Sequence, residues 1–181
     1  MRKHLVEIKA RSTGHAAQRE VLRAHDADFR GTDHQLDHYF NVPAGRLKLR
    51  SGTIEHSLIF YRRADQAGPK DSSVALTIFP DRAQADAVAA TLSTALGTWV
   101  TVDKHREIYF VGNVKIHLDT VAGLGQFIEI EAIGDRAEQR PQLLEQCRTW
   151  MRKLSVTETD LVERSYSDLL TDLNRDGTTS E

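Results

Sequence analysis

This sequence lacks several features that define large classes of proteins. It has one cysteine, Cys147, in 181 residues, so no disulfide can form within the chain. It also lacks an excess of either charge, because 24 lysines and arginines stand against 26 aspartates and glutamates, a formal net charge of −2. That balance disfavours a general nucleic-acid or membrane surface. The local arrangement of the charges therefore carries more information than their total.

Long apolar runs are missing as well. No segment approaches the roughly 20 consecutive apolar residues that span a bilayer, and the N-terminal residues contain no apolar signal core. No internal repeat or low-complexity linker divides the chain. We therefore expect one domain over residues 1–173, a flexible tail over residues 174–181, and a cytoplasmic protein without nucleic-acid or membrane partners. The oligomeric state, a homodimer included, stays open.

Charged residues at every second position mark several segments. Arg46, Lys48 and Arg50 alternate with leucines, and Glu129 and Glu131 alternate with isoleucines. Successive side chains of a β-strand point to opposite faces of the sheet. Each segment therefore has an apolar face that can pack and a charged face. One such strand alone is more often the solvated face of an ordinary sheet, but six strand segments carry ionisable residues in this pattern.

Periodicity and turn signals predict the order of elements. Period-two patterns predict strands over residues 3–11, 35–42, 45–51, 56–63, 73–79, 99–111, 114–120 and 126–133. Helical spacing predicts helices over residues 15–27, 82–96, 137–153 and 158–170. Eight strands in mostly hairpin order predict an α+β fold, a closed or nearly closed antiparallel barrel with surrounding helices. Helices on the apolar outside would leave the charged faces lining the interior.

Such an interior suits a polyphosphate with a divalent cation. Arginine forks match phosphate oxygens, and lysine supplies a compact charge. The candidate phosphate-binding residues are Lys9, Arg11, Arg46, Lys48, Arg50, Arg63, Lys70, Lys104, Arg106, Lys115 and His117. Carboxylate oxygens suit Mg²⁺ or Mn²⁺. The candidate metal ligands are Glu7, Asp119, Glu129 and Glu131.

These residues resemble the CYTH family, the triphosphate tunnel metalloenzymes. The resemblance covers most of the chain and is most specific over residues 115–119 and 123–131, where it is closest to the class IV adenylate cyclase-like subgroup. It implies an eight-stranded antiparallel tunnel that holds a triphosphate and one or two divalent metals. Carried over by position, Glu129, Glu131, Glu7 and Asp119 would bind metal. One departure stands out, because Leu5 occupies the position of the family's first glutamate.

The resemblance leaves the reaction open. The first hypothesis is an adenylate cyclase that converts ATP to cyclic AMP and pyrophosphate. The second is a triphosphatase acting on thiamine triphosphate, a nucleotide or inorganic triphosphate. The third is a non-catalytic binder of polyphosphate. Lys48 or Lys104 could act as a base if neighbouring cations depress its pKa, and Asp119 is the remaining catalytic candidate.

Overall fold

A computed structural model describes residues 4–12, 14–63 and 72–178. The strands are β1 (His4–Arg11), β2 (Asp28–Phe40), β3 (Arg46–Ser51), β4 (His56–Arg63), β5 (Ser72–Ile78), β6 (Thr98–Val111), β7 (Val114–Val121) and β8 (Gly125–Gly134). The α-helices are α1 (His15–Ala24), α2 (Arg82–Leu96), α3 (Arg140–Lys153) and α4 (Tyr166–Thr178), with short 3₁₀ turns at Ala137–Gln139 and Glu158–Asp160. None of the helices in these ranges has both the length and the apolar composition needed to cross a bilayer.

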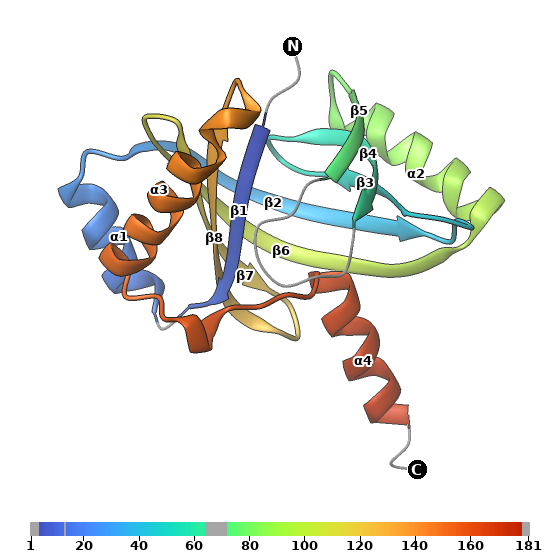
Figure 1. Cartoon of the computed structure of the whole chain (residues 1–181). Helices are drawn as coiled ribbons and strands as arrows, with labels where there is room; N and C mark the ends of the chain where they lie inside the picture. The colour runs from blue at the N-terminus through green and yellow to red at the C-terminus, as the bar shows by residue number, and fades with distance from the viewer. Residues whose placement is uncertain (1–3, 13, 64–71, 179–181) are drawn as a thin grey trace.

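All eight strands join one antiparallel sheet in the order β1-β8-β7-β6-β2-β3-β4-β5. The sheet is strongly curled, with β1 and β5 at its two ends and the helices arranged around it (Figure 1). The predicted eight-stranded antiparallel architecture with surrounding helices is confirmed. The curl gives the sheet a concave inner face, where every second side chain of a strand points.

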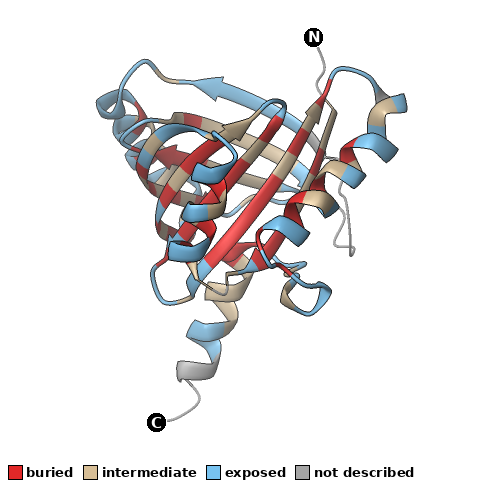
Figure 2. Ribbon diagram, turned by 90° about the vertical axis from the view of Figure 1, so that its left-hand side faces the viewer, coloured by how far each residue is buried: buried red, intermediate tan, exposed pale blue. Residues whose placement is uncertain are grey.

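Helices α1, α2 and α3 cover the outer face of the sheet, whereas α4 packs against the concave face beside the cavity, and three apolar clusters hold them there. The first joins α1 and α3 to β1, β7 and β8 through residues such as Leu22, Ile130 and Cys147. The second lies under α4 around Tyr166, and the third lies under α2 around Leu49. Figure 2 shows these buried residues as bands along the strands, with exposed residues on the outer sides of the helices. This packing leaves the charged strand faces on the inside.

Strand β2 is longer than predicted. The prediction began at residue 35, but β2 starts at Asp28 because it pairs with β6 along almost its whole length, with a register shift next to Gly31. The residues before 35 show little apolar alternation, so the pairing partner decides their conformation. The long β2–β6 ladder forms the middle of the sheet and gives it a rigid base.

The predicted last helix is present, but its predicted bounds, residues 158–170, are wrong. A 3₁₀ turn ends at Asp160, Leu161 then forms a β-bridge with Ala10, and α4 begins only at Tyr166. Ser165 caps α4, because its hydroxyl accepts from the amide of Asp168 (3.2 Å) while the Asp168 carboxylate accepts from the Ser165 amide (3.2 Å). The predicted tail begins at residue 174, whereas α4 continues to Thr178.

Candidate functional site

A cavity of about 660 Å³ occupies the concave face of the sheet. Seven of the strands contribute to its wall, and most of the contributing side chains sit two residues apart along a strand. The ionisable residues that line it are Glu7, Lys9, Asp37, Lys48, Arg50, Glu55, Tyr39, Tyr61, Lys104, Arg106, Glu129, Glu131, Tyr166 and His56. The sequence prediction that alternating charges gather in one interior therefore agrees with this lining.

Asp37 is the centre of the cationic part of the cavity. Its carboxylate is 1% exposed and accepts from Lys48 (2.9 Å), Lys104 (2.8 Å) and both Nε and Nη2 of Arg50 (2.8 and 3.0 Å). Burial alone would raise the pKa of Asp37, but the charges of Arg50, Lys104 and Lys48 hold that pKa well below its usual value. We call these four residues the Asp37 cluster. Three cations share one carboxylate here, so the cluster carries excess positive charge.

Lys104 is the more deeply buried of the two lysines that donate to Asp37, with 2% of its side chain exposed against 14% for Lys48. Burial, reinforced by the nearby charges of Arg50 and Arg106 and opposed by Asp37, lowers its pKa to about 7. An amine with this pKa is partly neutral near pH 7 and can accept a proton. This pKa is compatible with the predicted role of Lys104 as a base.

Arg106 and its partners form the floor next to the Asp37 cluster. Its guanidinium donates to Asp119 (Nε to Oδ1, 2.7 Å) and to Glu129 (Nη2 to Oε2, 2.6 Å), and Lys9 lies 3.2 Å from the other oxygen of Glu129. Asp119 is fully buried and also accepts from the Tyr166 hydroxyl (2.8 Å). Both oxygens of Asp119 are thus occupied, and it does not line the cavity. This arrangement favours a role in holding Arg106 over the predicted roles as metal ligand or catalyst.

Carboxylates crowd together on the neighbouring strands β1 and β8. Glu7 and Glu131 are directly opposite in the β1–β8 ladder. Burial, and then the charge of Glu7, raise the pKa of Glu131 to about 7. We call Glu7, Glu129, Glu131 and the adjacent His117 the Glu131 cluster. Its electrostatics are opposite to those of the Asp37 cluster, because here negative charge is in excess.

The Glu131 cluster fits a divalent cation. Donor atoms of His117, Glu129 and Glu131 lie within 4.8 Å of one another. His117 is 1% exposed, and neither of its ring nitrogens has a hydrogen-bond partner, the nearest carboxylate oxygens being 3.4 and 3.5 Å from Nδ1. Burial, and then Arg106, lower the pKa of His117 to about 4, so the ring is neutral and free to ligate. An unsatisfied buried imidazole beside crowded carboxylates is the donor set that a divalent ion would satisfy.

Part of the cavity wall is apolar. Val74, Leu76 and Ile78 of the edge strand β5 line it and are each more than half exposed. Ile54 and Ile59 line the cavity as well. A ligand with only charged groups would make no favourable contact with these apolar side chains. The cavity therefore offers an apolar contact surface beside its charged floor.

Several predicted residues lie away from this lining. Arg11 is exposed and donates to the Leu124 carbonyl, because its end of β1 extends past the cavity. Arg46 is held by Asp168 (2.7 Å) and Ser167 (3.1 Å). Lys115 lies 3.5 Å from Glu55, and His117 lies behind Glu129 and Glu131. Lys70 and the side chain of Arg63 lie outside the described part of the chain.

Two residues of the site, Asp37 and Glu55, are counter-ions of cavity cations, and the sequence did not predict this role. Asp37 reads as part of a polar pair at a strand end, yet it is the counter-ion of three cations. Glu55 precedes β4 in a turn, outside any alternating pattern, and its carboxylate accepts from Arg50 (2.8 Å). Burial opposes ionisation of Glu55, but Arg50 and Lys115 lower its pKa to about 2. The turn that presents Glu55 is itself held by Asp33, which accepts from the amides of residues 53, 54 and 55.

A curled eight-stranded antiparallel sheet around a charged cavity defines a β-tunnel protein. The model of the CYTH domain matches residues 3–166, and the chain belongs to this family. Leu5, at the position of the family's first glutamate, lines the cavity.

Individual proteins resemble the chain in part of its sequence or in its fold. "Putative adenylate cyclase MJ0240" of Methanocaldococcus jannaschii is 28% identical over 68 residues, which is 38% of this chain and only 39% of that relative. The PH1012 protein of Pyrococcus horikoshii OT3 superposes with a TM-score of 0.76 at 22% identity, covering 92% of this chain and 99% of its own. "Putative adenylyl cyclase HpAC1" from Hippeastrum, described as having a dominant triphosphatase activity, superposes with a TM-score of 0.59 at 17% identity, covering 84% and 89%.

Proposed function

We propose that the cavity binds a triphosphate-containing small molecule together with Mg²⁺ or Mn²⁺, and that the protein is an enzyme of the class IV adenylate cyclase type. The observation that carries this proposal is the separation of charge inside one cavity. The Asp37 cluster has excess positive charge for phosphate oxygens, and the Glu131 cluster has crowded carboxylates for a cation. A triphosphate carries several negative charges and needs several such donors at once.

The apolar wall supports a triphosphate ester over inorganic triphosphate. With phosphates held by Lys48, Arg50 and Arg106, an organic group on the same ligand would lie against β5 and the neighbouring isoleucines. Adenosine has both an apolar face and a hydroxyl that can react. Burial of that face contributes roughly 25 cal/mol per Å² of apolar area. ATP therefore uses both the charged floor and the apolar wall.

In the cyclase reaction the 3′-hydroxyl of ATP attacks the α-phosphorus. The proton of the hydroxyl passes to the neutral amine of Lys104, and the bond from the α-phosphorus to the bridging oxygen breaks to release pyrophosphate. Arg50, Arg106 and Lys48 stabilise the negative charge that moves onto the leaving oxygens. A divalent ion bound by Glu7, Glu129, Glu131 and His117 would supply Lewis-acid stabilisation of phosphate charge.

A triphosphatase is the second candidate, since Lys104 can accept a proton from water as well as from a sugar hydroxyl. Water would then attack the γ-phosphorus of a nucleotide, thiamine triphosphate or tripolyphosphate and release orthophosphate. The triphosphatase activity named for the Hippeastrum protein supports this alternative. A non-catalytic polyphosphate binder is the third, supported by Leu5 in place of the family's first glutamate.

One assay separates the three. Purified protein is incubated with Mn²⁺ or Mg²⁺ and, separately, ATP, thiamine triphosphate and tripolyphosphate. Cyclic AMP with equimolar pyrophosphate supports the cyclase. Orthophosphate without cyclic AMP rejects the cyclase and supports the triphosphatase. If nothing turns over but a triphosphate raises the unfolding temperature, the protein is a binder. Absence of both turnover and binding would reject the proposal.

A further inference from the structure

The outer face of the sheet carries a second group of metal-binding side chains, away from the cavity. His34 lies on β2, and Asp103 and His105 lie on β6. His34 and His105 are directly paired in the β2–β6 ladder, as are their neighbours Gln35 and Lys104. Gln35 and Lys104 are buried toward the inside. By strand alternation the two histidines and Asp103 point to the opposite side of the sheet.

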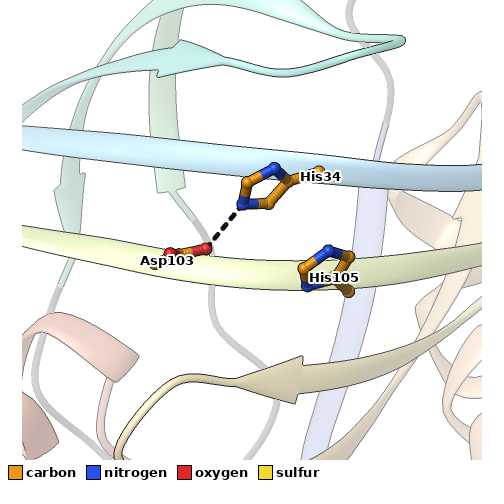
Figure 3. Close-up of side chains that lie close together, drawn as sticks. All are labelled: His34, Asp103 and His105. Atoms are coloured by element: carbon orange, nitrogen blue, oxygen red, sulfur yellow. Dashed lines mark hydrogen bonds and ion pairs between the residues drawn. The ribbon is translucent and has the colours of Figure 1, made fainter.

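The three side chains converge although His34 is far from Asp103 and His105 in the sequence. Nε2 of His34 lies 2.8 Å from Oδ1 of Asp103. The rings of His34 and His105 stack in parallel, with centroids 4.4 Å apart and planes 4° apart. One donor atom from each of the three residues lies within 4.8 Å of the other two. Figure 3 shows the three side chains together on one side of the two strands.

The chemistry of this group differs from that of the Glu131 cluster. Two imidazoles and one carboxylate suit a borderline transition-metal ion such as Zn²⁺, Ni²⁺ or Cu²⁺, whereas the Glu131 cluster has three carboxylates to one imidazole and so more of the oxygen ligands that Mg²⁺ and Mn²⁺ take. His34 and Asp103 are each partly exposed, with 37% and 49% of the side chain accessible, so an ion and its waters can reach them. The 2.8 Å contact between His34 Nε2 and Asp103 Oδ1 already places two of the three donor atoms side by side, and a bound ion would replace this hydrogen bond.

We propose that His34, Asp103 and His105 bind one Zn²⁺-like ion on the outer face of the sheet, independently of the divalent ion in the cavity. The backbone supports this role, because directly paired residues of an antiparallel ladder have Cβ atoms about 4.5–5.5 Å apart. The ion would join β2 to β6 directly behind Lys104, which lies between Asp103 and His105. Three protein ligands would leave coordination positions for water.

The test is a Zn²⁺ titration by calorimetry of the Glu129→Gln/Glu131→Gln variant, in which the cavity site has lost two carboxylates and the outer group is intact. We expect one Zn²⁺ per chain in this background, with affinity weakened at least about tenfold by adding His105→Ala or Asp103→Asn. His38→Ala is the matched control, because His38 lies on the same face of β2 and pairs with Thr101 instead (3.2 Å). It should leave the affinity unchanged.

A spectroscopic measurement identifies the ligands of the bound ion directly, in addition to the affinity. With one equivalent of Cu²⁺, electron paramagnetic resonance should show hyperfine coupling to two imidazole nitrogens in the same background and to one when His105→Ala is added. Asp103→Asn changes shape least and keeps the test valid if a histidine variant fails to fold. Equal Zn²⁺ affinity with and without His105→Ala or Asp103→Asn would overturn the proposal, as would the absence of Zn²⁺ binding in the Glu129→Gln/Glu131→Gln variant.

Discussion

In the Asp37 cluster three cations contact one buried carboxylate, whereas in the Glu131 cluster three carboxylates crowd beside a neutral histidine. Asp37 and Glu131 line the same cavity and burial raises the pKa of each, so burial alone cannot explain why their pKa values shift in opposite directions. The pKa of Asp37 is held well below its usual value, and that of Glu131 is raised to about 7. Each cluster carries the charge that a ligand of opposite sign would neutralise. This difference in charge is the basis for the proposal that the cavity takes two ligands, an anion and a cation.

The largest effect should come from disabling the Glu131 cluster. Glu129→Gln combined with Glu131→Gln should reduce metal-dependent turnover by at least about 1,000-fold, since metal ions supply several kcal/mol of charge stabilisation. Turnover is measured under saturating Mn²⁺ and ATP. Glu145→Gln combined with Glu158→Gln, on exposed sites, is the matched control. Unchanged activity in the cavity variant would reject the metal assignment.

Neutralising one carboxylate should change the free energy of unfolding in opposite directions in the two clusters. Asp37→Asn leaves three buried cations without their carboxylate and should lower the free energy of unfolding by about 3–5 kcal/mol. Glu131→Gln removes a crowded charge and should raise that free energy at pH 8 by roughly 1–3 kcal/mol. Urea unfolding without metal measures both. If the free energy of unfolding changes in the same direction in both variants, the proposed difference between the two clusters is contradicted.

Lys104 should be required as a base and not only as a charge. Lys104→Arg keeps the positive charge beside Asp37, but a guanidinium does not give up its proton. We expect kcat to fall about 100-fold, the usual scale of general-base catalysis. Lys48→Arg is the control and should retain most of kcat. If Lys104→Arg keeps wild-type kcat, Lys104 acts through its charge.

The smallest predicted effect is a pH dependence of metal affinity. Below pH 7 Glu131 holds a proton that Mn²⁺ must displace, so the affinity should fall about tenfold per pH unit and level off above pH 7. The same shift means that the metal-free protein loses stability as pH rises between about 4.5 and 7, where only the unfolded state has lost this proton. Mn²⁺ titrations from pH 5.5 to 8.5 test the first statement. The dependence should disappear in Glu131→Gln.

Strand alternation predicted much of the sheet and of the site, because inward-facing charges such as Lys48, Lys104 and Glu131 repeat every second residue. Alternation does not reveal where a strand leaves the cavity, so Arg11 was expected inside but lies at an exposed strand end. It also does not reveal counter-ions, so the role of Asp37 was missed. The capping pair at Ser165 and Asp168 was a readable signal for the start of α4.

The outer histidine group and Glu55 were not predicted because they depend on how strands and turns pair in the folded protein. His34 and His105 are far apart in the sequence, and only the alignment of β2 with β6 brings their rings together. The sequence alone describes the histidines as scattered, without zinc spacing. Glu55 was missed for a similar reason, since its position depends on the turn that Asp33 holds. Such sites arise from tertiary contacts that no local pattern encodes.

The most direct test of the account measures two ligands on two variants. Binding of tripolyphosphate in EDTA and binding of Mn²⁺ without phosphate are determined by calorimetry for Lys48→Met and Glu131→Gln. The account predicts that Lys48→Met weakens tripolyphosphate about tenfold or more and leaves Mn²⁺ unchanged, because one charge-assisted contact contributes about 1.5–3 kcal/mol. Glu131→Gln should weaken Mn²⁺ and leave or strengthen tripolyphosphate binding. Equal loss of both ligands in both variants would contradict the division of the cavity into an anion site and a cation site.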